Sequence, residues 1–338
     1  MSLLQKAVWP HLEFARPSAR HFDAVVGLLA MAAITTTTAA GIMQAESADA
    51  DPVAATVRSS ETLAPATPRT DFQARETVAS FYISQPFYYR SDVAMQRNDG
   101  TDIKLKQMGW DGDALMPPID GGVRSMHWYG STGFMIDFLH NKAVSRLGKG
   151  AHGRKIENGV IEEVETEGTL KGQPAPAKLK LTDLFTRFEF THGHNVLLFN
   201  GIVRLAGLSP RIRPYAGAGV GVAVPHVEVW FKDEKLENRT NEYQYTGSAA
   251  QAFAGVELRV GRMSYYVEYK FSWASIGGAL TGSESWKNFN LPGDLLRQLS
   301  RWWSGEKPTY GNFSTTLTAH QVAGGVGFRL GSTAAPVP

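Results

Sequence analysis

The sequence contains no cysteine among its 338 residues. Disulfide bonds and thiol chemistry are therefore excluded, and an exported form of the chain would depend on packing alone for its stability. No run of about 18 apolar residues is present, so no helix is expected to cross a bilayer. The formal net charge of +2 is too small to indicate a nucleic-acid partner.

The first 50 residues predict a secretory signal peptide. Basic residues precede a short apolar run, Ala24 to Ile34, and small residues follow it. This order of charged region, apolar region and small-residue cleavage site is typical of a signal peptide, and cleavage is expected at Ala45 or Ala50. A disordered or helical N-terminus is the alternative. Residues 51–76 are rich in Ala, Pro, Thr and Ser and are expected to form a flexible linker.

Eight segments of the remaining chain alternate apolar residues with polar or small ones, which is the period of a β-strand. They are Thr77 to Ser91, Gly122 to Trp128, Gly133 to Asn141, His192 to Leu205, Arg213 to Val229, Ala249 to Val260, Met263 to Ser275 and Thr315 to Leu330. Short turns and long segments alternate between them. The pattern predicts an all-β fold over residues 77–330, an eight-stranded antiparallel up-and-down outer-membrane β-barrel with long extracellular loops. Residues 331–338 are expected to form a periplasmic tail.

The two faces of the expected strands differ in the way that a membrane barrel requires. Along Met263 to Ser275, aromatic and aliphatic side chains would face lipid, and charged or small ones would face inward. A narrow eight-stranded barrel is filled by side chains, and buried charges are tolerable only in pairs. We therefore predict a paired polar core made of Asp137, Glu257, Arg259, Glu268, Lys270 and Arg329. The alternative is a soluble β-sandwich or lipocalin-like barrel, whose outer faces should carry more charge.

The fifth segment, Arg213 to Val229, changes character along its length. Its glycines at 217, 219 and 221 are not a nucleotide-binding loop, because the alternation continues through them and no helix follows. Pro225 is expected to interrupt the strand ladder where the strand leaves the membrane. Beyond it, His226 and Glu228 share one face of the strand.

Most histidines of the expected barrel fall near its outer rim, where strands three, four, five and eight could converge. Imidazole and carboxylate side chains with open coordination positions suit a catalytic transition metal. The predicted metal ligands are His192, His194, His226, Glu228 and His320, and the predicted catalytic residues are His194, His226 and Glu228. The alternation places His320 on the lipid-facing side, which conflicts with this role unless a bulge intervenes. Alternatively, these histidines only make hydrogen bonds at the rim.

Other segments predict contacts with an anionic lipid. Residues 146–155 form a flexible basic loop whose Lys149, Arg154 and Lys155 could bind phosphate groups. Residues 291–303 predict one short amphipathic helix with Arg297 and Arg301, either at the headgroup boundary or packed as a cap. Trp286 and Lys287 belong to a polar, aromatic patch of the kind that binds sugars. A second candidate chemistry is a lipid deacylase with Ser314 and His320, although no nucleophile motif marks the serine.

Several blocks of sequence resemble the lipid A oxidases of the rhizobial type. They are SFYISQPFYYR at 80–90, FTHGHNVLLF at 190–199, PHVEVW at 225–230, TNEYQY at 240–245 and WKNF at 286–289, together with FLHNK at 138–142 and GKGAHGRK at 148–155. The resemblance covers residues 77–330. It implies an outer-membrane enzyme that uses molecular oxygen to convert the proximal glucosamine of lipid A to 2-aminogluconate, with release of hydrogen peroxide.

The resemblance assigns no catalytic residues, so the candidate site residues rest on the pattern of the sequence. No flavin or nicotinamide motif is visible, and an unidentified transition metal or other divalent cation is the most economical activator of oxygen. The expected partner is lipid A, or lipopolysaccharide, in the outer leaflet, and the expected state is a monomer that binds no nucleic acid. A non-enzymatic barrel or adhesin remains the third alternative.

Overall fold

The computed structural model describes residues 75–205, 209, 211–282 and 290–333. The chain divides into two units, residues 1–51 and 52–338, and every described residue belongs to the second. The predicted signal peptide and most of the predicted linker therefore lie outside the described residues. Within the described ranges no helix has the length and apolar character needed to cross a bilayer.

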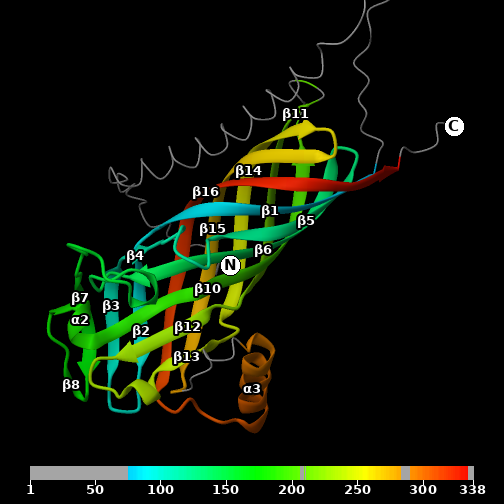
Figure 1. Ribbon diagram of the computed structural model, residues 1–338. Coiled ribbons are helices and arrows are strands. Elements are labelled where there is room, and N and C mark those ends of the chain that lie inside the picture. The colour runs from blue at the N-terminus through cyan, green and yellow to red at the C-terminus, as the bar shows by residue number, and fades with distance from the viewer. Residues whose placement is uncertain (1–74, 206–208, 210, 283–289, 334–338) are drawn as a thin grey trace, which may run out of the picture. The chain divides into compact units, whose positions relative to one another are not determined.

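Eight antiparallel strands form a closed ring, which confirms the predicted barrel (Figure 1). In order around the ring they are β1 (Arg75–Tyr88), β5 (Gly121–Tyr129), β6 (Thr132–Ser145), β10 (Phe185–Arg204), β11 (Ile212–Ala223), β14 (Gly247–Val260), β15 (Met263–Leu280) and β16 (Gly311–Thr333). Pairing of β1 with β16 closes the ring. Each ring strand overlaps one of the eight predicted segments, and five of the segments lie wholly within their strand. Thr77 to Ser91 and His192 to Leu205 run past the ends of β1 and β10, and Arg213 to Val229 is divided between β11 and β12.

The segments between ring strands hold further strands. The sequence predicted loops over most of them, although Ser91 and residues 226–229 belong to the first and fifth predicted strand segments. The further strands are β2 (Ser91–Gln96), β3 (Asp102–Met108), β4 (Trp110–Asp111), β7 (Glu163–Leu170), β8 (Gln173–Pro174), β9 (Lys178–Lys180), β12 (His226–Phe231) and β13 (Thr240–Tyr243). With the short helices η1 (Ala151–Gly153), α2 (Leu181–Leu184) and η2 (Leu236–Asn238), they form what we call the head. Helix α3 (Leu291–Ser304) contacts the head through β13. The head extends the barrel wall because β16 pairs with β2 and β10 pairs with β12 beyond the ring (Figure 1).

The inside of the ring is a paired polar core, as predicted. Lys270 Nζ lies 2.6 Å from Asp137 Oδ2, and the guanidinium of Arg124 contacts both oxygens of Glu268 at 2.9 and 3.0 Å. These four side chains are fully buried. Because each charge has an opposite partner, the desolvation penalty of burying it is offset.

A second group of charges lies towards the other end of the ring and centres on Glu76. Its carboxylate contacts Arg204 and Arg259, both at 2.7 Å, and Arg329 at 3.6 Å, while Arg259 also contacts Glu257 at 3.1 Å. All six predicted core charges are thus paired. The sequence analysis missed Glu76, Arg124 and Arg204, which complete the pairs.

The outside of the ring is apolar. On β11, Val220 is 68% exposed while Tyr215 points inward and is buried. The inward-facing Gly217 leaves room for Phe253, since an added Cβ would lie only 2.4 Å from its ring. β11 ends at Ala223 and β12 begins at His226, so Pro225 interrupts the ladder as predicted. At the C-terminal end β16 continues to Thr333, three residues into the segment expected to be a tail.

Candidate functional site

The candidate site lies where β10 passes from the barrel into the head. The strand is irregular there, because its register with β6 shifts between Phe190 and His194. Gly193 lies at the shift with a φ of 119°, a backbone conformation that residues other than glycine rarely adopt. The prediction that His192 and His194 share one face of the strand is therefore wrong. His194 turns into the barrel, is buried and lies 3.4 Å from the hydroxyl of Tyr88, whereas His192 lines a hollow on the outside.

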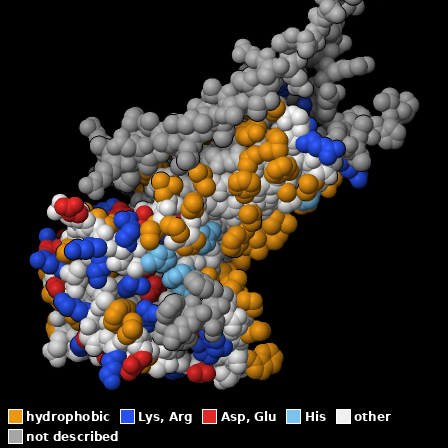
Figure 2. All heavy atoms as spheres, in the orientation of Figure 1, with side chains coloured by type: hydrophobic (Ala, Val, Ile, Leu, Met, Phe, Trp, Pro, Cys, Tyr) orange, Lys and Arg blue, Asp and Glu red, His pale blue; other side chains and the backbone are white. Residues whose placement is uncertain are grey.

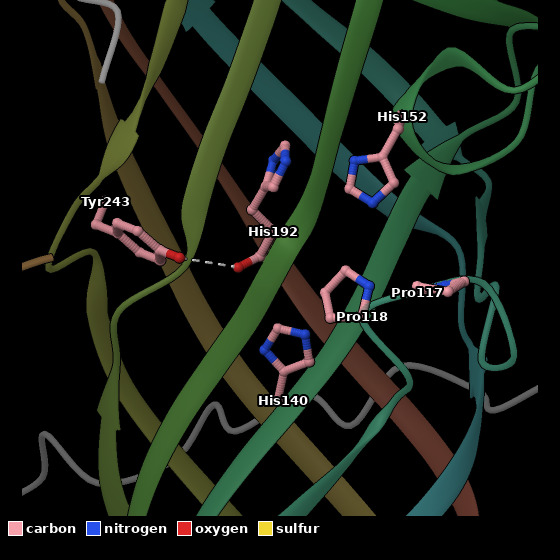
Figure 3. Close-up of a pocket in the computed structure, with 6 residues that line it drawn as sticks. All are labelled: Pro117, Pro118, His140, His152, His192 and Tyr243. Carbon is pink, nitrogen blue, oxygen red and sulfur yellow. Dashed lines mark hydrogen bonds between the residues drawn. The ribbon is translucent and has the colours of Figure 1, made fainter. Parts of the chain in front are cut away.

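The hollow has a volume of about 580 Å³ and is lined by Pro117, Pro118, His140, His152, His192 and Tyr243 (Figure 3). His140 continues the outward-facing row of β6 that includes Phe134, Ile136 and Phe138, all exposed, so the hollow lies on the outer wall. Figure 2 shows histidine side chains at the surface between the apolar wall and the charged head. The geometry places imidazoles at the boundary between two very different surfaces.

Three rings that line the hollow form a chain of contacts with the buried ring of His226 behind them. The rings of His152 and His192 are 4.5 Å apart, those of His192 and His226 4.7 Å, and those of His226 and Tyr243 also 4.7 Å. His226 is fully buried, and neither of its ring nitrogens has a hydrogen-bond partner among the described residues. Burial, together with His192 and Arg239 nearby, lowers the pKa of His226 to about 3. Burial likewise lowers the pKa of His152 to about 4, so both rings are neutral at pH 7.

Two buried glutamates stand beside these rings. Glu189 on β10 and Glu228 on β12 are cross-strand partners, and their exposed fractions are only 2% and 1%. Glu228 Oε1 accepts hydrogen bonds from Arg187 at 2.6 Å and from Arg239 at 3.4 Å. Burial and the charge of Glu228 raise the pKa of Glu189 to about 8. Glu189 therefore carries a proton at neutral pH.

Backbone and hydroxyl groups fix the position of the protonated carboxyl. Glu189 Oε1 accepts hydrogen bonds from the backbone N–H of His152 at 3.0 Å and from the hydroxyl of Thr191 at 2.8 Å. The first bond connects the glutamate pair to η1, whose residue His152 lines the hollow. The cluster offers neutral imidazoles that can accept a proton, a carboxyl that can donate one, and two guanidinium groups.

Of the five predicted metal ligands, only His192 and His226 have rings in contact. His194 turns into the barrel, and Glu228 is occupied by two arginines. His320 lies on the outer wall of β16, where its ring nitrogens contact the hydroxyls of Tyr89 and Tyr269. No bulge redirects it towards the hollow, because its register with β15 is regular. Across the described ranges, no group of three or more His, Cys, Asp or Glu side chains has the arrangement of a metal site.

The predicted substrate-binding residues divide into three groups. Lys149, Arg154 and Lys155 are exposed in the segment around η1, next to the hollow, although Arg154 also pairs with Asp113 at 2.8 Å. Arg297 and Arg301 are engaged in ion pairs with Glu242, at 3.7 and 2.9 Å, which attach α3 to the head. Trp286 and Lys287 lie outside the described residues.

The deacylase arrangement of Ser314 with His320 is wrong. Both residues lie on β16, six positions apart, and a strand rises about 3.3 Å per residue, so they are separated by roughly 20 Å. Ser314 pairs with β2 in the head, and His320 contacts tyrosines on the barrel wall. No other serine of the sequence stands in a nucleophile motif that could replace Ser314 in this role.

Sequence reasoning missed Arg187, Glu189, His152 and Arg239 as members of the site. His152 was read only as part of the basic loop, and the two arginines and Glu189 lie in segments that were read as loops. One signal was present, because residues 187–190, Arg-Phe-Glu-Phe, already alternate polar with apolar side chains where they lead into the block at 190–199. That alternation predicts an extension of the fourth strand and places Arg187 and Glu189 on one face.

Comparisons with known proteins add only distant similarities. No family model and no curated protein matches the chain. The solved structures that match include Neisserial surface protein A, with 9% identity, 74% of this chain and 97% of that chain covered, and a TM-score of 0.28. Another is Ail of Yersinia pestis, solved with the heparin analogue sucrose octasulfate, with 7% identity, coverage of 76% and 99%, and a TM-score of 0.28. Similarity at this level supports no statement about the function of this chain. The barrel described above rests on the strand pairing of the chain itself.

Proposed function

We propose that the chain is an outer-membrane β-barrel enzyme that oxidises the proximal glucosamine of lipid A at the outer face of the membrane. The apolar outer wall of the ring, with aromatic side chains such as Tyr269, Phe271 and Trp273 exposed, suits a lipid environment. Five of the blocks of sequence that resemble the lipid A oxidases contribute residues to the site, at 138–142, 148–155, 190–199, 225–230 and 240–245.

The observation that carries this proposal is the position of the hollow on the outside of the wall, next to the head. A lipid in the outer leaflet could present its sugar there without leaving the membrane. Its phosphate groups would meet the exposed Lys149, Arg154 and Lys155 on one side of the hollow. A channel through the barrel is not required, since the lumen is filled by the paired polar core.

The proposed reaction removes two electrons and two protons from the anomeric carbon and its hydroxyl and transfers them to O₂, which becomes hydrogen peroxide. Water then opens the lactone to the 2-aminogluconate. His152 lines the hollow, is neutral and can accept the hydroxyl proton. His226 is neutral and buried behind His192, where it supports the imidazole cluster, and protonated Glu189 can donate a proton. The side chains at the hollow do not form a metal site of three or more ligands within the described ranges, so no step is assigned to a metal.

Purified protein in lipid vesicles, supplied with lipid A and oxygen, should release hydrogen peroxide and add one oxygen atom to the lipid by mass. His226→Gln should abolish both signals, while the matched variant His320→Gln, on the wall away from the hollow, should retain them. Absence of peroxide and of the mass change with wild-type protein would refute the oxidase. The presence of a chelator in a parallel reaction tests the metal predicted from the sequence.

The second candidate is a non-enzymatic barrel that binds ligands through its head. Two observations favour it: the head is an ordered extension of the barrel sheet, and charged side chains gather on it (Figure 2). In that case the lipid A profile of cells would be the same with and without the chain. Loss of cell-surface ligand binding on deletion of the head would then identify its role.

A further inference from the structure

Helix α3 has well-defined ends and a polar side that attaches it to the head. Asn290 caps the first turn by accepting a hydrogen bond from Gly293 N at 3.1 Å, and Gly305 ends the helix with a φ of 66°. Asp294 accepts from Tyr243 N at 2.9 Å. Gln298 exchanges two hydrogen bonds with the backbone of Tyr245, at 2.8 and 2.9 Å. The helix is therefore fixed to the chain segment that lines the hollow.

The adjacent side of α3 is apolar and uncovered. Leu296, Leu299 and Trp303 are spaced three and four residues apart, so they share one face with the neighbouring Trp302. All four side chains are exposed, and Trp303 is 91% exposed. A third side carries Ser300 and Ser304, which are exposed and polar. The helix thus presents separate docked, apolar and polar sides.

We propose that the apolar side of α3 lies in the outer leaflet of the bilayer that surrounds the barrel. The helix is attached to residues 243–245, and ring strand β14 begins two residues later at Gly247, so α3 lies where the wall meets the head (Figure 1). The exposed apolar surface of the barrel wall ends at the same boundary. Tryptophan next to arginine is the combination that favours the headgroup region. Arg301 directly precedes Trp302 and Trp303 in the helix, and Arg297, one turn earlier, is about half exposed.

This placement gives the helix a mechanical role. Because Asp294 and Gln298 bind the backbone at Tyr243 and Tyr245, a helix seated in the leaflet holds Tyr243, and with it the hollow, at the level of the lipid headgroups. The inference rests on the proposed membrane setting of the barrel, and it is independent of the oxidase chemistry.

The absence of natural cysteines allows single nitroxide labels on the full chain folded into liposomes. Labels at Trp303→Cys and Leu299→Cys report the apolar side of α3, and Ser300→Cys is the matched control one residue further along the same helix. Val220→Cys reports the barrel wall. Power-saturation measurements compare relaxation by oxygen, which concentrates in the bilayer, with relaxation by a water-soluble nickel chelate.

The labels at 303, 299 and 220 should be relaxed more by oxygen than by the nickel chelate, and the label at 300 should show the reverse. If the labels at 299, 300 and 303 are all relaxed more by the nickel chelate than by oxygen, while the label at 220 is relaxed more by oxygen, the placement of α3 is overturned and the membrane barrel remains supported. Protection of 299 and 303 from both reagents would show that protein covers the helix, for example a second copy, and would also overturn it. An aqueous label at 220 would overturn the membrane setting itself.

Discussion

The protonation of Glu189 leads to a quantitative prediction. Its pKa is about 8 in the folded protein, against an ordinary value of 4.5, because it is buried beside Glu228. A raised pKa means that the folded state binds the proton more tightly than the unfolded state. The resulting stabilisation is complete below about pH 4.5 and is lost as the pH rises through about 8. The total is on the order of 5 kcal/mol, and the part lost between pH 6 and pH 8 is about 2 kcal/mol.

Glu189→Gln should remove this dependence. Glutamine keeps the oxygen that accepts hydrogen bonds from His152 N and Thr191, and its amide resembles the protonated acid without titrating. Histidines with lowered pKa values, such as His226, change stability in the opposite direction as the pH falls below about 6.5. They are present in both proteins, so their contribution cancels in the difference between wild type and variant.

Hydrogen exchange measured by mass spectrometry gives the local free energy of opening for peptides from residues 185–191 and 226–231. After correction for the intrinsic exchange rate at each pH, the wild type should lose about 2 kcal/mol more than Glu189→Gln between pH 6 and pH 8. Glu163→Gln, at an exposed position on β7, is the control and should behave like the wild type. If wild type and Glu189→Gln show the same pH dependence, Glu189 does not carry a proton at neutral pH.

Three further predictions concern the core, the wall and the chemistry. Lys270→Met leaves the buried carboxylate of Asp137 without its cation and should destabilise the barrel by about 3–5 kcal/mol. The folded barrel should then lose its characteristic gel mobility at a lower temperature than the wild type. An unchanged temperature would contradict the paired core. Val220→Arg places a charge on the proposed lipid face and should cost about 2 kcal/mol in equilibrium folding into vesicles, while Val220→Thr should cost much less; equal effects argue against a lipid-facing wall. His226→Gln should lower peroxide release by about 10²-fold or more while His320→Gln keeps it near wild type, and similar losses in both would remove the hollow as the site.

The barrel could be predicted from the sequence because a strand in a membrane barrel has two chemically different faces. The alternation in Met263 to Ser275 identifies the strand, its lipid-facing side and its inward charges without any knowledge of neighbours. The need to pair buried charges then predicts the polar core. The capped amphipathic helix at 291–303 is equally local, since its cap, its spacing and its final glycine all lie within sixteen residues of chain.

The site depended on information that the alternation does not contain. Residues 185–191 belong to β10, but their partner β12 lies across a chain reversal, so the pairing of Glu189 with Glu228 is a tertiary fact. The register shift at Gly193 turns His194 into the barrel and leaves His192 outside, although simple alternation places them together. The identity of the ring strands is thus determined locally by the sequence. The direction of the histidines is decided by irregular pairing at the junction with the head, which only the folded chain determines.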